Sequence, residues 1–166
     1  DLADYIYAME DVTLAERLVE ALRLHKMHVS TAESFTAGGV GRAIVQVPGA
    51  SDVFFEGINA YANRAKHIRL GVNEYTLKHK GAVSDETAFE MAAGLLRGGN
   101  CELAIATTGL AGPRADGTNK PVGLCFLAAG TNERVRVFRF QLTGDRETIT
   151  RTAINYALFL AYKQIA

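Results

Sequence analysis

The chain has 166 residues, of which 48% are hydrophobic and 22% are charged, and its 18 basic side chains balance 18 acidic ones. A chain of this length buries roughly 70% of the surface that it exposes when unfolded, so a core forms without disulfides or a structural metal. These values exclude disordered, collagen-like and membrane-spanning classes, and the zero net charge provides no basic field for polyphosphate or anionic lipid. We therefore expect neither nucleic acid nor a membrane among its partners.

The sequence is typical of a cytoplasmic protein. Its first residues, Asp-Leu-Ala-Asp-Tyr, lack the basic and then apolar pattern of a signal peptide, and no apolar run approaches the roughly 20 residues that span a bilayer. Cys101 and Cys125 lie in apolar surroundings without a CxxC or metal-ligand spacing, so we expect two buried thiols. The four histidines do not cluster, and neither a metal site nor a cofactor is expected.

The first half of the chain alternates predicted helices and strands. Thr13 and Glu16 form a capping-box pattern ahead of leucines that repeat at helical spacing. Further on, Pro48-Gly49 breaks a helix, and Gly71 stands where a left-handed residue would end one. The predicted elements are a helix at 13–27, a strand at 28–33, a helix at 40–47, a strand at 53–61 and a short helix that Asn63 caps.

The second half continues this alternation. The predicted elements are a helix from Ser84 to Gly98, strands at 103–107, 122–128 and 134–140, and a last helix from about Asp145. A glycine-rich polar loop at 108–120 separates the first two of these strands. In the third strand the apolar alternation slips once, which a bulge or burial on both faces would explain.

Interleaved helices and strands predict the α/β class, with a three-layer α/β/α sandwich around a mostly parallel or mixed central sheet. No internal repeat, low-complexity tract or linker divides the chain. We therefore expect one domain over residues 1–166, with residues 1–11 as an N-terminal extension.

Three polar segments punctuated by glycine each follow a predicted strand, at residues 32–39, 61–66 and 107–123. In open α/β sheets this edge binds ligands, because the following helices present unpaired N–H groups and the positive ends of their dipoles. The three segments are therefore expected to converge on one crevice.

Ser34 lies at a strand-to-helix turn, where its hydroxyl would project from the sheet edge and the amides after it would hold an oxyanion. No histidine lies in the three segments, but a lysine desolvated beside a serine has a lowered pKa and takes the hydroxyl proton. Lys66 would then be the base of a Ser-Lys dyad, with Tyr61 relaying a proton or fixing the geometry. Spacing alone favours a simpler interpretation, in which Ser34 caps a helix, Lys66 is solvated and Tyr61 is a strand aromatic.

The loop from Thr108 to Gly123 is longer than a strand connection needs, which favours a ligand-binding role over a structural one. Its backbone amides would bind a phosphate or ribose, with Lys120 as the counter-charge. The absence of a GxxxxGK[ST] pattern excludes a Walker-type loop. After the loop and the next two strands, Asp145 is expected to cap the last helix, and Arg146 either pairs internally or reaches an anionic substrate.

Several short stretches occur in order along the chain: Glu33-Ser34-Phe35-Thr36-Ala37-Gly38, Pro48-Gly49-Ala50-Ser51, Tyr61-Ala62-Asn63-Arg64-Ala65-Lys66, Gly81 to Ser84, Thr108 to Pro113, Lys120 to Gly123 and Gly144-Asp145-Arg146. They correspond to the motifs Glu-Ser-Cys-Thr-Gly-Gly, Pro-Gly-Ser-Ser, Tyr-Ser-Asn-x-x-Lys, Gly-Ala-Val-Ser, Thr-Gly-Ile-Ala-Gly-Pro, Lys-Pro-Val-Gly and Gly-Asp-Arg. From about Leu14 to the C-terminus the chain thus resembles the CinA C-terminal domain family, which includes the stand-alone nicotinamide mononucleotide deamidases of bacterial NAD salvage.

The resemblance implies an α/β/α sandwich that hydrolyses the carboxamide of nicotinamide mononucleotide to nicotinate mononucleotide and ammonia, without a metal. It implies that Ser34 attacks the carboxamide carbon, that Lys66 is the base and that Tyr61 assists, with amides near residues 36–38 at the oxyanion. It also implies a small pyridine nucleotide as the ligand and a homo-oligomer as the assembly. The residues expected to bind substrate are Glu33, Thr36, Ala37, Gly38, Asn63, Thr108, Gly109, Ala111, Gly112, Lys120 and Arg146.

Four positions depart from the family pattern: Phe35 replaces a cysteine, Ala37 a glycine, Ala62 a serine and Thr150 an arginine. Ala37 lacks the freedom of glycine at positive φ, Phe35 adds bulk where substrate would enter, and Thr150 removes a cation. The alternative function is therefore a weak or inactive paralogue that acts as a nucleotide-binding or assembly domain.

Overall fold

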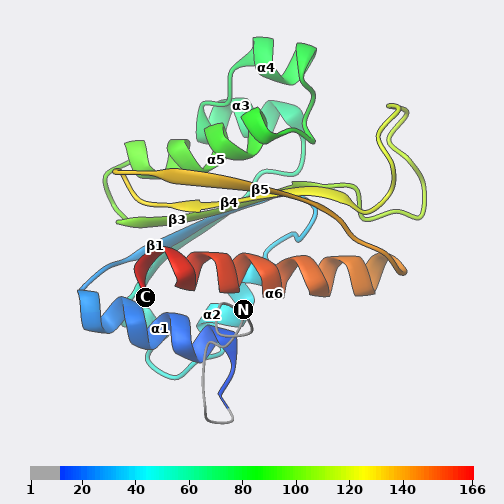
Figure 1. Ribbon diagram of the computed structural model, residues 1–166. Helices are drawn as coiled ribbons and strands as arrows, with labels where there is room; N and C mark the ends of the chain where they lie inside the picture. The colour runs from blue at the N-terminus through cyan, green and yellow to red at the C-terminus, as the bar shows by residue number, and fades with distance from the viewer. Residues whose placement is uncertain (1–11) are drawn as a thin grey trace.

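Five strands form one mixed sheet in the order β2-β1-β3-β4-β5 (Figure 1). The computed structural model describes residues 12–166, so the expected extension at 1–11 lies outside the described residues. The strands are β1 Val29–Glu33, β2 Phe54–Asn59, β3 Leu103–Gly109, β4 Leu124–Gly130 and β5 Val135–Gln141. β1 runs parallel to both β2 and β3, whereas β4 is antiparallel to β3 and β5. In this register Glu33 lies beside Asn59 on one side and Thr107 on the other, so the carboxyl ends of β1, β2 and β3 share one edge.

Helices cover both faces of the sheet, which confirms the three-layer α/β/α prediction (Figure 1). On one side lie α1 Leu14–His25, α2 Gly39–Val45 and α6 Arg146–Ile165, and on the other α3 Asn63–Leu70 and α5 Asp85–Arg97, with the short α4 Glu74–His79 farther out. A single turn of 3-10 helix, η2 Ala50–Asp52, precedes β2. None of the helices in residues 12–166 is long and apolar enough to cross a membrane.

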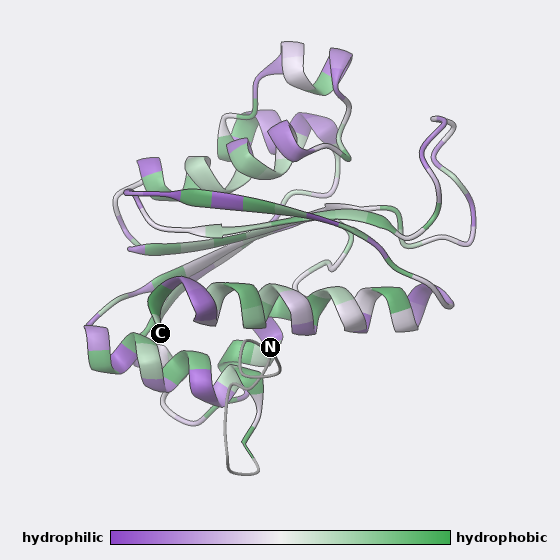
Figure 2. Ribbon diagram, in the orientation of Figure 1, coloured by the Kyte–Doolittle hydropathy of each residue, from purple (hydrophilic) through white to green (hydrophobic). Residues whose placement is uncertain are grey.

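Two apolar clusters, one on each face, hold the layers together. The first packs α1, α2 and α6 on the sheet, with Leu18, Leu22, Ile105 and Leu127 at its centre, and the second packs α5 around Met91 on the opposite face. Figure 2 shows the inner strands mostly in the hydrophobic colour, whereas the outlying α4 is mainly hydrophilic or neutral. Because β1 is buried on both faces, the residues that follow it begin inside the molecule.

Local sequence signals explain most of the element ends. Thr13 and Glu16 form the expected capping box, the Ser84 hydroxyl accepts from the amide of Thr87, and Gly71 ends α3 in the left-handed region. Both predicted buried thiols are confirmed. These ends follow from side chains next to the helix in sequence, which is why they were predictable.

Two details differ from the sequence predictions, and the structure decides between two alternatives at a third position. Ala62, not Asn63, is the N-cap of α3, and α4 was not predicted, because it has six mostly polar residues. β5 pairs with β4 in continuous register, so the slip at 134–140 is not a bulge. Val137 and Phe138 are both half-buried, as expected for a strand that is covered on both faces.

Candidate active site

The three polar segments meet at the carboxyl edge of the sheet, as predicted. The amide of Ser34 donates to the carbonyl of Thr107 at 3.0 Å, which joins the end of β1 to β3. The amide of Ala60 donates to the carbonyl of Glu33 at 2.8 Å, which joins the residue after β2 to β1. Parallel pairing therefore places Ser34 between the segment that leads into α3 and the end of β3.

Ser34 and Lys66 contact each other directly. The Lys66 Nζ lies 2.9 Å from the Ser34 Oγ, and 2.9 Å from each of the backbone carbonyl oxygens of Ala60 and Tyr61. Lys66 is only 1% exposed and Ser34 8% exposed. The simpler interpretation from spacing, a solvated lysine and a capping serine, is therefore wrong for this pair.

Burial lowers the pKa of the Lys66 ammonium from its ordinary value of 10.5 to about 8. Within residues 12–166 no carboxylate forms an ion pair with it. When the amine is neutral, its two N–H groups match the two carbonyl oxygens, and its lone pair is left for the Ser34 hydroxyl. The carbonyls of Ala60 and Tyr61 thus hold the Lys66 amine toward the serine oxygen.

The turn after Ser34 leaves few amides free for an oxyanion. The amide of Ala37 donates to the Ser34 carbonyl at 3.0 Å, and that of Gly38 donates to the Glu33 carboxylate at 3.1 Å. The amides of Phe35 and Thr36 donate to no acceptor in the described part of the chain. Of the amides expected at residues 36–38 to bind an oxyanion, only that of Thr36 is without an acceptor in the described residues. The amide of Phe35, which was not expected, is the second one without an acceptor.

Two predicted substrate-binding residues lie inside the wall of the site. Glu33 is fully buried, and its carboxylate accepts from the start of α2 and from the hydroxyl of Thr36 at 2.6 Å. The Thr36 hydroxyl also lies 2.7 Å from that of Thr107. These buried side chains bind one another and the turn that carries Ser34.

Tyr61 and Arg146 form the exposed rim. Tyr61 is 61% exposed, and its hydroxyl lies 3.4 Å from the Arg146 Nη2. The Arg146 Nη1 donates to the carbonyl of Gly112 at 2.6 Å, so α6 is joined to the β3–β4 loop. In the described residues it is the backbone carbonyl of Tyr61, not its hydroxyl, that contacts Lys66. Asn63 is exposed at the start of α3.

The β3–β4 loop is anchored by residues that were expected to bind substrate. The Thr108 hydroxyl donates to the carbonyl of Ala82 at 2.6 Å, and Ala111 is buried. The Lys120 Nζ donates to the carbonyls of Lys80, at 2.8 Å, and Val83. Lys120 therefore ties the loop to the segment before α5, with its ammonium already engaged.

Phe35 belongs to the core, which corrects the expectation that it adds bulk at the entrance. It is 5% exposed and packs in the cluster beneath α6. A Cβ on Gly109 would lie 3.0 Å from the Phe35 Cε1, so this glycine provides the room for the ring. Ala37 does adopt the left-handed region, with φ at 47°, as its place in a glycine position predicted.

Two residues of the site were missed by the sequence analysis. Thr107 accepts from the Ser34 amide and contacts the Thr36 hydroxyl. It lies in the polar segment predicted at 107–123 but was not among the residues expected to bind substrate. Asn59 is exposed at the end of β2, and a Cβ on Gly38 would lie 3.0 Å from its Nδ2. The position of Asn59 at the end of a strand that precedes a polar segment was the signal that could have identified it.

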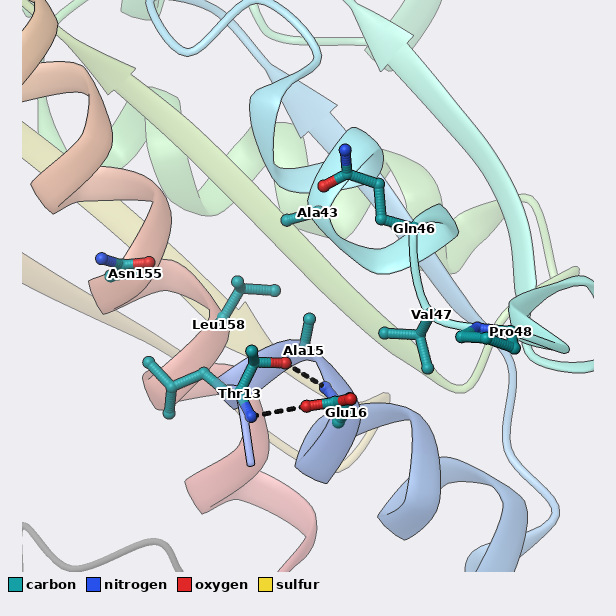
Figure 3. Close-up of a pocket in the computed structure, with 10 residues that line it drawn as sticks. Thr13, Ala15, Glu16, Ala43, Gln46, Val47, Pro48, Asn155 and Leu158 are labelled. Carbon is teal, nitrogen blue, oxygen red and sulfur yellow. Dashed lines mark hydrogen bonds between the residues drawn. The ribbon is translucent and has the colours of Figure 1, made fainter. Parts of the chain in front are cut away.

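One cavity lies away from the dyad. It has a volume of about 480 Å³ and is lined by the start of α1, the end of α2 and the middle of α6, including Thr13, Gln46, Asn155 and Leu158 (Figure 3). The dashed lines in Figure 3 are the capping-box bonds of Thr13 and Glu16, so this end of α1 forms one wall. In residues 12–166 no group of three or more His, Cys, Asp or Glu side chains could hold a metal ion.

Comparisons with known proteins agree on one family. The model of the CinA C-terminal domain matches residues 11–165. A CinA-like protein of Kosmotoga olearia is 45% identical over 157 residues, which are 95% of this chain and 38% of that protein. The chain spans about two-fifths of the length of the curated relatives it matches.

Solved structures of related proteins indicate the same family. The competence/damage inducible protein of Agrobacterium tumefaciens is 36% identical with a TM-score of 0.86, covering 91% of this chain and 94% of that chain. A CinA superfamily protein of Klebsiella pneumoniae is 28% identical with a TM-score of 0.87, covering 90% and 94%. The mixed five-stranded sheet is thus shared with proteins of known structure.

Proposed function

Because this chain belongs to the CinA C-terminal domain family, we propose that it is an amidohydrolase that converts nicotinamide mononucleotide to nicotinate mononucleotide and ammonia. The observation that carries the proposal is the 2.9 Å contact between the Lys66 Nζ and the Ser34 Oγ, with both side chains buried. A serine becomes a nucleophile only beside a base, and burial poises this lysine to act as one near neutral pH.

In the proposed reaction the Ser34 Oγ attacks the carboxamide carbon while neutral Lys66 accepts the hydroxyl proton. The carbonyl oxygen becomes an oxyanion, which we assign to the free amides of Phe35 and Thr36. The intermediate then collapses, the C–N bond breaks, and the Lys66 ammonium returns its proton to the departing ammonia. A water molecule, deprotonated by the same lysine, then attacks the acyl carbon. As the bond between that carbon and the Ser34 Oγ breaks, the Lys66 ammonium returns the proton to the serine oxygen, which releases the acid product, and this ionises to the carboxylate.

The rest of the nucleotide is assigned to the rim. Tyr61 presents an exposed ring beside the dyad, and Arg146 uses two of its five N–H groups on Tyr61 and Gly112, which leaves donors for a phosphate. Asn63 and Asn59 supply further exposed polar groups at the ends of the neighbouring segments. The expected self-association and cytoplasmic location stay predictions.

Ammonia release from nicotinamide mononucleotide tests the proposal. Wild-type protein should release ammonia in buffer with a chelator, and Ser34→Ala and Lys66→Met should lose it while keeping the wild-type circular dichroism spectrum. Because the neutral fraction of Lys66 grows as pH rises through about 8, kcat/KM should rise with pH and level off above about 9. A folded wild-type protein that releases no ammonia at high concentration would refute the proposal.

A nucleotide-binding domain without turnover is the second candidate, favoured by Thr150. Its hydroxyl donates to the carbonyl of Arg146 at 2.8 Å, where the family pattern has an arginine. This candidate predicts that nicotinamide mononucleotide stabilises the protein, by about 2.7 kcal/mol at 100 times its Kd, with no product formed. Ser34→Ala would then leave the stabilisation almost unchanged.

A further inference from the structure

We propose that Glu33 is a positioning residue for the nucleophile, and that it acts by holding the turn whose amides receive the oxyanion. The inference rests on the proposed function, since it concerns the same reaction. It assigns to Glu33 a role different from the substrate contact that the family resemblance suggested. Its basis is the set of hydrogen bonds around the buried Glu33 carboxylate.

The Glu33 carboxylate accepts hydrogen bonds from four donors. Its Oε2 accepts from the Thr36 hydroxyl at 2.6 Å, from the Gly38 amide at 3.1 Å and from the Val40 amide at 3.0 Å. Its Oε1 accepts from the Gly41 amide at 2.8 Å. Three of these donors are backbone amides at the start of α2, which would otherwise lack partners inside the helix.

The network continues to the strand on the far side of the nucleophile. Because a carboxylate only accepts, the Thr36 hydroxyl donates to Glu33, and the Thr107 hydroxyl must then donate to Thr36 at 2.7 Å. The carbonyl of Thr107 accepts from the amide of Ser34. Ser34 is thereby held on one side through β3, and the turn after it is held on the other through Glu33.

This arrangement also decides where an anion can bind. The start of α2 was expected to offer free amides, but those of Gly38, Val40 and Gly41 are taken by Glu33. The amide of Gly39 donates to the carbonyl of Thr36 at 2.9 Å. The free amides of Phe35 and Thr36 are therefore the donors left beside Ser34, and their directions depend on the turn that Glu33 holds.

Glutamine cannot replace Glu33 without loss. It has the same shape, but its amide group places an NH₂ donor where one of the two carboxylate oxygens accepts. In one orientation the NH₂ faces the Gly41 amide, and in the other it faces three donors, so at least one contact becomes repulsive. The turn should shift, and a misplacement of about 1 Å at a reacting centre costs on the order of 100-fold in rate.

Glu90 provides a matched control. Its carboxylate also accepts from one amide, that of Asn73, and from one hydroxyl, that of Thr76, each at 2.6 Å. These contacts lie at the start of α4, outside the candidate site. Glu90→Gln should therefore lower the stability of the protein in the same way, by replacing a carboxylate that accepts from a backbone amide. It should leave the turn after Ser34 unchanged.

The experiment compares Glu33→Gln, Glu90→Gln, Thr36→Val and Thr36→Ser with the wild type. For each protein, kcat and KM are measured for nicotinamide mononucleotide, and a fluorophosphonate labels the reactive serine, with the labelled fraction and site found by mass spectrometry. Expressing kcat per labelled chain separates a slower site from a smaller folded fraction. Thr36→Val keeps the glutamate but removes one donor, so it tests the network even if Glu33→Gln does not fold.

We expect Glu33→Gln to lower kcat per labelled chain on the order of 100-fold and Thr36→Val about 10-fold, with KM within about twofold. Thr36→Ser, which keeps the hydroxyl, should regain most of the activity lost in Thr36→Val, and Glu90→Gln should match the wild type. Equal kcat per labelled chain in Glu33→Gln and the wild type, or no difference between the valine and serine variants, would overturn the inference.

The same data distinguish the failure of the two proposals. If wild-type Ser34 is labelled but no ammonia is released, the substrate assignment fails, and the labelling rates of the variants still decide the role of Glu33. If wild-type Ser34 is neither labelled nor active, both the dyad and the positioning role are refuted. If wild-type activity is present and the variants do not differ, only the positioning role is refuted.

Discussion

Replacing Lys66 with methionine should change how the stability of the protein depends on pH. Burial lowers the pKa of Lys66 from 10.5 to about 8, because the ammonium is removed from water and compensated only by neutral oxygens. A difference of that size corresponds to about 3 kcal/mol of unfolding free energy. Methionine has a similar length and no charge, so the variant lacks this contribution at every pH.

The sign follows from the protons bound in each state. Below about pH 8 the ammonium is charged in both states, and its burial costs the full amount. Between about pH 8 and 10.5 the unfolded chain still binds the proton that the folded chain has released, so the unfolding free energy rises with pH. Relative to Lys66→Met, the wild type should therefore gain about 2 kcal/mol between pH 7 and 10.

Urea unfolding at several pH values measures this difference. Far-UV circular dichroism is the suitable signal, because the chain has no tryptophan and tyrosines ionise near pH 10. Comparing each variant with the wild type cancels the titration of groups that both share, including the thiols. Lys78→Met, which removes an exposed lysine on α4, controls for the loss of a positive charge.

A difference between the wild type and Lys66→Met that stays constant to within about 0.5 kcal/mol from pH 7 to 10 would refute the reasoning. A difference that changes in the opposite direction would also refute it, since it would mean that the folded state favours the charged amine. Either result would remove the physical basis for Lys66 as a base near neutral pH.

Three further predictions concern the packing around Ser34. Gly109→Ala should lower the unfolding free energy by about 1–3 kcal/mol in urea titrations. The new Cβ would lie 2.6 Å from the Cβ of Cys125 and 3.0 Å from Phe35. A variant as stable as the wild type would contradict this packing. Ala37→Gly should be at least as stable as the wild type, since a φ of 47° strains alanine. The control Ala93→Gly, within α5, should lower the unfolding free energy by about 1 kcal/mol. Equal losses of unfolding free energy in both variants would show that the turn is not strained. Burial raises the pKa of Cys125 to about 12, so iodoacetamide at pH 8 should alkylate it only after unfolding, and rapid labelling of the folded protein, read by mass spectrometry, would contradict its burial.

Much of the fold was predictable because it depends on neighbours in sequence. Thr13, Ser84 and Asp145 cap the helices that they precede, and alternating helices and strands already indicated the three layers. The convergence of the polar segments followed from the same alternation, since parallel strands bring their carboxyl ends to one edge. α4 was missed because six mostly polar residues carry too weak a periodic signal.

The candidate site was predictable only in part. Motif resemblance pointed to Ser34 and Lys66, but their contact depends on the backbone carbonyls of Ala60 and Tyr61, whose positions follow from the end of β2. For Glu33 the residue type and place were evident, whereas the direction of its carboxylate was not. A side chain on a strand that is buried on both faces has no polar face from which its direction can be read.

By itself, then, the sequence determined the order of the elements, most of their ends and the segments at the carboxyl edge of the sheet. Only the tertiary structure decided that Lys66 is buried against Ser34, that Phe35 packs in the core and that Glu33 binds the start of α2. Helix caps and hydrophobic periodicity depend on residues that are close together in the sequence. The burial and the hydrogen bonds of these three side chains depend on contacts with segments that are distant in the sequence. For that reason the chemistry of Lys66, a lysine in the middle of a polar stretch, could not be read from its neighbours alone.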